Sequence, residues 1–334
     1  MKLAITNSVG EKGKNIGSDV KLIRALINVY RRKKKRTIAA VSGTCDTSLI
    51  EEISNFQKEH QKNLAPDGQV TSSHSGSFKS LVAFMKSTRT HVAIRKPSNG
   101  QLTWKAEGSE GGRYHSRVLH VPSNTSGLTI GRGYDLKQRS TAEIKKHLSL
   151  VSISSNAATK ISQAAGLQGL AARQFIIDED LLDFEISAQA QLALFELVYK
   201  DITADVKRIG NKSSVIKAYG KTNWDELDPA ILDILVDLRF RGDYTGNSRK
   251  KIQKSVSSND FDELKKSLQK RRIGSYGQLI ALICVKSIWM RLVMKSEKRE
   301  RVPSNQVITE QKYRTISQQV LPNDSIFNTK LIDY

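Results

Sequence analysis

Apolar residues recur at the three- and four-residue spacing of an amphipathic helix in three stretches near the N-terminus. A polar turn, Pro-Asp-Gly at residues 66–68, separates the second stretch from the third. This pattern predicts a small bundle of three helices over residues 1–88. The stripes consist of Val20, Ile23, Leu26 and Ile27, then Leu49, Ile53 and Phe56, then Phe78, Leu81, Val82 and Met85.

The pattern changes after a polar stretch at residues 89–101, which we interpret as a linker to a second domain over residues 102–334. Residues rich in β-formers at 117–121 and 128–130 predict two short strands. Helical patterns follow, and the sequence predicts a mainly α (α+β) protein with a small β element and a helical body in this domain. Several of these helices begin at a residue able to cap them, namely Ser140, Ser187, Asp228 and Asp260.

The net charge of +21 predicts an anionic partner, such as nucleic acid, a membrane surface or a cell-wall polymer. Part of this charge lies in a run of six basic residues at 31–36, which we expect to be solvated. Cys45 and Cys284 have no CxxC partners, and His115 and His120 have no third ligand nearby. The sequence therefore predicts no metal site, no cofactor and no disulfide framework.

The N-terminus does not resemble a secretory signal peptide, because one lysine is followed by no apolar run. The most apolar stretch, residues 279–294, is interrupted by Lys286 and Arg291, so we expect a buried or amphipathic helix there and no membrane insertion. The sequence thus predicts synthesis in the cytoplasm, with any export by a route that does not use classical signals.

Carboxylates lie in two glycine-rich segments that follow the linker. Glu107 and Glu110 come first, and Asp135 follows Thr129 within the string SGLTIGRGYDL at residues 126–136. Glycosidic hydrolysis uses two carboxyl groups on either side of the scissile bond, one protonated and one ionised. Spacing alone is also compatible with solvated surface carboxylates.

This string, together with the Glu107-Gly108 pair, resembles the muramidase domain of pesticin-like, phage-type lysozymes, a group that includes type VI secretion effectors. The resemblance covers most of residues 102–242. It implies cleavage of the β-1,4 bond between N-acetylmuramic acid and N-acetylglucosamine with inversion. Glu107 matches the general acid, Asp135 the carboxylate that positions the water, and Thr129 the threonine that helps to hold it.

The acid assignment has a rival in Glu110, which we expect to be freely solvated beside two glycines. Glu107 has apolar neighbours, so we expect partial burial to raise its pKa and keep it protonated. Inversion needs room for a water, and the carboxyl groups of Glu107 and Asp135 should then lie roughly 6.5–9.5 Å apart. Tyr114, Arg132 and Tyr134 are candidates to line a sugar groove, with packing or surface positions as the alternative.

Residues 1–88 resemble the peptidoglycan-binding domain of many cell-wall hydrolases, with the basic run as an insertion. The two resemblances together imply peptidoglycan as substrate and partner. They favour an antibacterial effector delivered to the periplasm of target bacteria by a dedicated secretion system, with a cognate immunity protein in the producer. Phage lysis and toxin uptake are alternative routes.

Two other classes of function remain open from the sequence. A nucleic-acid-binding protein would use residues 31–36 and the basic residues Arg271 and Arg272, although no recognised binding motif accompanies them. A wall-binding protein that has lost its activity would not need the intact set of Glu107, Thr129 and Asp135.

Overall fold

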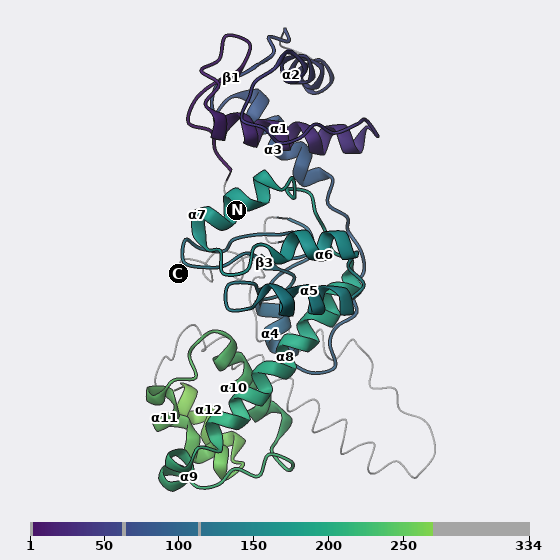
Figure 1. Cartoon of the computed structure of the whole chain (residues 1–334). Helices are drawn as coiled ribbons and strands as arrows, with labels where there is room; N and C mark the ends of the chain where they lie inside the picture. The colour runs from purple at the N-terminus through teal and green to yellow at the C-terminus, as the bar shows by residue number, and fades with distance from the viewer. Residues whose placement is uncertain (1–2, 62–64, 113–114, 270–334) are drawn as a thin grey trace, which may run out of the picture. The chain divides into compact units, whose positions relative to one another are not determined.

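The computed structural model describes residues 3–61, 65–112 and 115–269 (Figure 1). Twelve helices make up 53% of these residues, and the strands are few and short. The prediction of a mainly α protein is therefore confirmed.

The three helices predicted near the N-terminus are present, and they pack around a core of aromatic and aliphatic side chains. Tyr30 is fully buried and meets Phe56 edge to face, with 5.3 Å between the ring centroids. A two-stranded antiparallel sheet, which the sequence did not predict, pairs Val9 with Val70. The elements are β1 (Val9–Gly10), α1 (Gly17–Lys33), α2 (Thr47–His60), β2 (Gln69–Val70) and α3 (Gly76–Ser87).

A hairpin and several helices follow residue 100. The strand predicted at 128–130 is present and pairs with a second strand at 134–135, because Gly131 and Gly133 adopt positive φ angles of 64° and 84° and reverse the chain between them. The strand predicted at 117–121 is wrong, since only isolated bridges form there, one of them joining His120 to Thr129. The elements are α4 (Gln101–Ala106), β3 (Thr129–Ile130), β4 (Tyr134–Asp135), α5 (Thr141–Leu150), α6 (Ser155–Ser162), α7 (Gly169–Asp178) and α8 (Ala188–Gly210).

The last described helices begin where their capping residues predict. Asp228 accepts a hydrogen bond from the backbone N–H of Ala230 at 2.8 Å, and Asp260 accepts one from Glu263 at 2.9 Å. None of the helices in the described part of the chain combines the length and the apolar character that a bilayer span requires. The stretch 279–294 lies outside the described residues. The elements are α9 (Ser213–Tyr219), α10 (Pro229–Phe240), α11 (Gly246–Ser257) and α12 (Phe261–Gln269).

The chain divides into two compact units, Met1–Asp201 and Ile202–Tyr334, so the division falls within α8. The predicted limits of 1–88, 89–101 and 102–334 stay a prediction, but the segment 89–101 is not a free spacer. Thr90 donates hydrogen bonds to Glu185 from its backbone N–H at 3.1 Å and from its hydroxyl at 2.9 Å. This linker segment is therefore held against the rest of the first unit.

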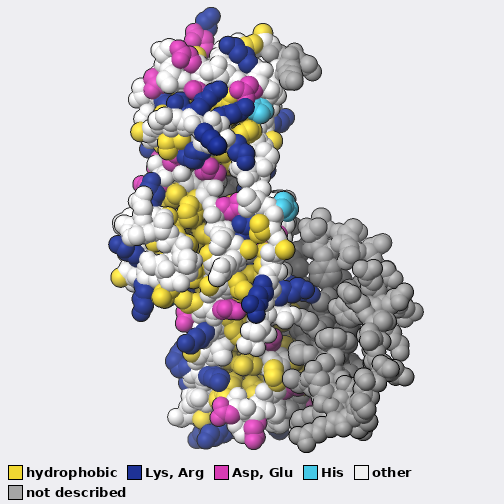
Figure 2. Space-filling model, turned by 90° about the vertical axis from the view of Figure 1, so that its right-hand side faces the viewer, with side chains coloured by type: hydrophobic (Ala, Val, Ile, Leu, Met, Phe, Trp, Pro, Cys, Tyr) yellow, Lys and Arg dark blue, Asp and Glu magenta, His cyan; other side chains and the backbone are white. Residues whose placement is uncertain are grey.

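The basic run at 31–36 is not simply solvated, because most of its side chains form ion pairs. Arg32 at the end of α1 pairs with Asp180 and Asp183, and Figure 2 shows the basic side chains of the N-terminal helices interspersed with acidic ones. Local sequence could not reveal these carboxylates, because they come from α2 and from residues about 150 positions away. The other pairs are Arg31 with Glu52, Lys34 with Glu59, and Arg36 with Glu52 and Glu59.

The Pro-Asp-Gly turn at 66–68 is fixed by one buried amide. Gln57, only 3% exposed, accepts hydrogen bonds at Oε1 from the backbone N–H groups of Asp67 and Gly68, at 3.1 and 2.9 Å. Its Nε2 donates to the carbonyl of Gln69 at 2.9 Å. This side chain therefore satisfies the backbone of the turn that leads into β2.

We expect Gln57→Leu to lower the free energy of unfolding by about 1–3 kcal/mol, because the buried N–H group of Gly68 and the partly buried one of Asp67 lose their acceptor. Lys58→Ala, on the exposed side of the same helix, should change it by less than about 0.5 kcal/mol. Urea unfolding followed by circular dichroism measures both. Equal stability of the two variants would contradict the role given to Gln57.

Candidate active site

The hairpin of β3 and β4 brings Thr129 and Asp135 together. The two residues are directly opposite each other in the antiparallel pair. Cross-strand partners of this kind have Cβ atoms about 4.5–5.5 Å apart on one face of the sheet. The two residues therefore lie on one element of structure, while their catalytic roles stay a prediction.

The carboxylate of Asp135 is oriented by backbone N–H groups. Oδ1 accepts a hydrogen bond from Lys137 N at 2.7 Å, and Oδ2 accepts one from Gly127 N at 3.4 Å. Thr129, 5% exposed, donates from Oγ1 to the carbonyl of Gly127 at 3.3 Å. Gly127 leaves room for this arrangement, because a Cβ there would lie 2.1 Å from Asp135 Oδ1.

Glu107 lies at the C-terminal end of α4 and is partly buried. Its backbone N–H donates to the carbonyl of Thr103 at 2.9 Å, which closes the last turn of the helix. The neighbouring Trp104 is 4% exposed and packs edge to face on Phe195 of α8, with 5.0 Å between ring centroids. The short helix is thus anchored by Trp104 while Glu107 ends it.

Arg132, in the turn of the hairpin, is buried at 6% exposure. It was a candidate to line a sugar groove, and its burial fits the alternative, a role in packing. Its Nη1 donates to the carbonyls of Trp104 and Gly108, and its guanidinium lies 4.2 Å from the centroid of the Trp104 ring. Burial lowers the pKa of Arg132 to about 10, while the charges of Glu110 and Glu107 act in the opposite direction. The hairpin is therefore connected directly to the backbone on both sides of Glu107.

Glu110 is not freely solvated, contrary to expectation. Its Oε2 accepts a hydrogen bond from Arg117 Nε at 2.9 Å, and its Oε1 accepts one from Gln191 Nε2 at 3.3 Å. The side chain of Arg117 is only 3% exposed, so this ion pair is largely shielded from water. A carboxylate that accepts hydrogen bonds at both oxygens is poorly suited to donate a proton.

A second carboxylate, Glu185, completes the surroundings of Arg117. Arg117 Nη1 lies 2.7 Å from Glu185 Oε1, and His115 Nε2 lies 2.8 Å from the same oxygen. Burial opposes the ionised form of Glu185, but hydrogen bonds from Thr90 and His115 and the charge of Arg117 lower its pKa overall. The network holds residues 108–112, the loop that follows Glu107.

The histidines near the site have partners other than a metal. Gly111 N donates to His115 Nδ1 at 2.8 Å, which makes Nδ1 an acceptor and assigns the proton of the neutral ring to Nε2. The Nδ1 of His120 lies 3.0 Å from the carbonyl of Val118. Within the ranges that the structure describes, no group of three His, Cys, Asp or Glu side chains is arranged to hold a metal ion.

Tyr134 is part of the core. It was a candidate to line a sugar groove, and its burial fits the alternative, a role in packing. It is 1% exposed, its hydroxyl lies 3.0 Å from His147 Nδ1, and the guanidinium of Arg139 lies 4.6 Å from its ring centroid. Burial raises the pKa of its hydroxyl. Tyr114, the other tyrosine predicted to bind sugar, lies outside the described residues.

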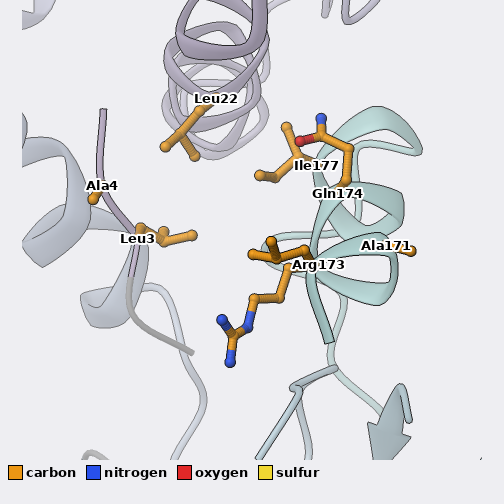
Figure 3. Close-up of a pocket in the computed structure, with 8 residues that line it drawn as sticks. Leu3, Ala4, Leu22, Ala171, Arg173, Gln174 and Ile177 are labelled. Atoms are coloured by element: carbon orange, nitrogen blue, oxygen red, sulfur yellow. The ribbon is translucent and has the colours of Figure 1, made fainter. Parts of the chain in front are cut away.

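An open cavity of about 420 Å³ occurs elsewhere in the first unit and is lined by none of the predicted site residues (Figure 3). Leu22 of α1 and Ile177 of α7 point toward it, and Arg173 lies at its edge. It is mostly apolar, and its walls offer no carboxylate. The cavity is therefore unrelated to the hydrolytic chemistry considered for Glu107 and Asp135.

Sequence reasoning missed the polar residues that support the loop after Glu107. Gln191 of α8 is fully buried, and its Oε1 accepts a hydrogen bond from Ser116 Oγ at 2.7 Å. A signal existed, because Gln191 stands among the apolar residues Leu194, Phe195 and Val198 of a predicted helix. A polar side chain in such a position needs a buried partner.

Comparison with known proteins places these residues within one family. The model of a family described as a domain of unknown function, DUF8812, matches residues 100–275, which is just over half of the chain. The match includes Glu107, Thr129 and Asp135 and leaves out the N-terminal three helices. No curated protein matches the chain.

We expect Gly127→Ala to lower the free energy of unfolding by about 1–3 kcal/mol, because the added Cβ forces the Asp135 carboxylate away from Lys137 N. Gly246→Ala is the matched control, since its Cβ would meet nothing closer than 3.9 Å. Thermal unfolding of both variants measures the difference. A Gly127→Ala variant as stable as the wild type would show that the carboxylate of Asp135 does not occupy this position.

The partly buried ring of His120 should make stability depend on pH. Burial lowers its pKa in the folded protein, so below about pH 6.5 the unfolded chain binds a proton that the folded chain does not. The contribution of the neutral His120 ring to the free energy of unfolding is therefore lost as the pH falls, by at most about 1.4 kcal/mol per pH unit. Urea unfolding from about pH 7.5 to about pH 5.5 should show a smaller decrease for His120→Gln than for the wild type.

The control for this measurement is His74→Gln, at an exposed position. It should keep the pH dependence of the wild type. If both variants retained that dependence, His120 would not be a source of it.

Proposed function

The chain belongs to the DUF8812 family, whose function is not known, and we propose that it is a muramidase, a peptidoglycan hydrolase that cleaves the β-1,4 bond between N-acetylmuramic acid and N-acetylglucosamine. One observation supports this proposal above the others. Thr129 and Asp135 face each other on a hairpin whose Arg132 is hydrogen-bonded to the backbone on both sides of Glu107. The hairpin that carries Thr129 and Asp135 is thus hydrogen-bonded to the backbone next to Glu107, the third residue that the resemblance to pesticin-like lysozymes selects.

In the proposed reaction, Glu107 donates its proton to the glycosidic oxygen, O4 of the N-acetylglucosamine, as the bond from that oxygen to C1 of the N-acetylmuramic acid breaks. A water held by Thr129 and Asp135 attacks C1 from the opposite face, and its proton passes to Asp135. The product has the inverted configuration at C1. The reaction leaves one new hydroxyl group on C1 of the N-acetylmuramic acid and one on C4 of the N-acetylglucosamine. Proton exchange with solvent then returns Glu107 to its protonated form and Asp135 to its ionised form.

The assignment of the acid to Glu107 is supported by the surroundings of Glu110. Glu110 accepts hydrogen bonds from Arg117 and Gln191 at its two oxygens. Removing it would break the compensation of the buried Arg117, so Glu110 acts on the architecture of the site. Glu107 ends α4, and Arg132 of the hairpin donates to the backbone carbonyls of Trp104 and Gly108 on either side of it.

The N-terminal helices fit the proposal as a wall-binding module, which would raise the concentration of the catalytic residues on an insoluble polymer. The net charge of +21 favours binding to a wall rich in free carboxylates and makes it sensitive to salt. Within this proposal the protein is an antibacterial effector, delivered by a secretion machinery to the periplasm of target bacteria and neutralised in the producer by an immunity protein.

The surroundings of the basic run at 31–36 support nucleic-acid binding less well than the sequence alone does. Arg31, Arg32, Lys34 and Arg36 of the basic run are paired with carboxylates. Phosphates would have to displace these partners. Arg271 and Arg272 lie outside the described residues.

We expect the wild type to clear suspensions of purified murein sacculi and to release reducing ends, and Glu107→Gln and Asp135→Asn to lose at least about 10²-fold of this rate. Each change removes a proton donor or acceptor while keeping the shape of the side chain. Glu51→Gln, on the exposed side of α2, is the matched control and should be fully active.

Two results would contradict these assignments. Full activity of Glu107→Gln, with loss in a folded Glu110→Gln, would transfer the acid role to Glu110. An intact wild type that leaves sacculi unchanged but binds duplex DNA, with an affinity that falls steeply with salt, would favour the nucleic-acid hypothesis.

A further inference from the structure

The position of Arg132 within the hairpin is unusual because its side chain leaves the hairpin and reaches α4. It lies in the turn between β3, which carries Thr129, and β4, which carries Asp135. Its Nη1 donates to the carbonyls of Trp104 and Gly108, the latter directly after Glu107. The Arg132 side chain therefore connects the turn between Thr129 and Asp135 to the backbone on either side of Glu107.

The guanidinium is held rigidly between several groups. It lies over the indole of Trp104, which also packs edge to face with Phe195. Gly108 allows the backbone to approach closely, because a Cβ there would lie 2.6 Å from the Cβ of Ser116 and 3.5 Å from Cγ of Arg132. Both hydrogen bonds come from one nitrogen, Nη1, while the stacking on Trp104 uses the planar guanidinium in a way that lysine cannot reproduce.

Substrate binding does not explain this residue, since 6% exposure leaves almost no surface for a sugar. Its Nε is buried without a hydrogen-bond partner among the described residues, and a buried unsatisfied donor costs about 1–3 kcal/mol. The buried Arg24 has the same unpartnered Nε, so what distinguishes Arg132 is that it donates to carbonyls on both sides of Glu107.

We propose that Arg132 is a positioning residue, which sets the separation between Glu107 and Asp135 by clamping the end of α4 to the turn of the hairpin. This inference rests on the proposed muramidase function. An inverting hydrolase requires a defined space for water between its two carboxyl groups, roughly 6.5–9.5 Å across. Arg132 acts on this space without touching the substrate.

The experiment uses the full chain and a soluble tetrasaccharide of the peptidoglycan glycan strand, so that wall binding plays no part. The variants are Arg132→Met, Arg132→Lys and, as the matched control, Arg24→Met. Arg24 is a 3% exposed arginine of α1 that donates to the carbonyl of Thr44 and pairs with Asp46. Each protein is characterised by thermal unfolding and by kcat and KM.

We expect Arg132→Met to lower kcat on the order of 10²-fold, with KM changed by less than about twofold, because a displacement of about 1 Å between reacting groups has an effect of that size. Arg132→Lys keeps the charge and should recover about tenfold of the loss. Arg24→Met should lose stability and keep the kcat of the wild type.

The possible failures are distinguishable. A wild type that does not cleave the tetrasaccharide overturns the proposed function before any variant is compared. If the wild type is active, three results would overturn the positioning role alone. Folded Arg132→Met could keep the kcat of the wild type, or its loss could appear in KM alone. Arg132→Lys could also match the wild type when Arg132→Met does not fold. If neither substitution at Arg132 folds, Arg132 is a structural residue and the inference is wrong.

Discussion

The guanidinium of Arg132 brings a positive charge into the interior of the first unit, and a charge there has to be compensated. The compensation comes from two backbone carbonyls, from the face of Trp104 and from the charges of Glu110 and Glu107. None of these groups belongs to the hairpin. The need to neutralise one buried cation therefore couples the hairpin to the end of α4, and the relation between Asp135 and Glu107 follows from that coupling.

Arg117 imposes a second constraint of the same kind on the loop after Glu107. It is paired with Glu110 on one side and Glu185 on the other, and Glu185 also accepts from His115. Glu110 thus acts on both buried cations, since its charge also raises the pKa of Arg132. Of the two carboxylates three residues apart, Glu110 is thus fixed by partners on both oxygens, and Glu107 is partly buried at the C-terminal end of α4. Such a division between neighbouring carboxylates is a common basis for assigning different roles to them.

The sequence predicted what local chemistry determines and failed where distant residues decide. Helices that start at Ser140 and Asp228 were predictable, because each cap satisfies its own helix. The pairing of Thr129 with Asp135 was predictable in outline, since glycines at 131 and 133 permit a tight turn. The burial of Arg132 was not, because its partners lie about 25 residues earlier and nothing in the string around it distinguishes a stacked arginine from a ligand-binding one. The same applies to Glu110, whose partner Gln191 lies 81 residues away.

Buried ion pairs are weak evidence for stability, because apolar residues of similar volume often serve as well. The N-terminal helices have a mostly aromatic and aliphatic core, in which the buried Gln57 satisfies backbone groups of a turn and the buried Arg24 pairs with Asp46. The segment from Trp104 to Asp135 holds more such groups, with two buried arginines, a buried histidine and four partly buried carboxylates in or beside it. Their concentration around Glu107 and the hairpin is therefore an argument for chemistry at this place that does not depend on the resemblance to lysozymes.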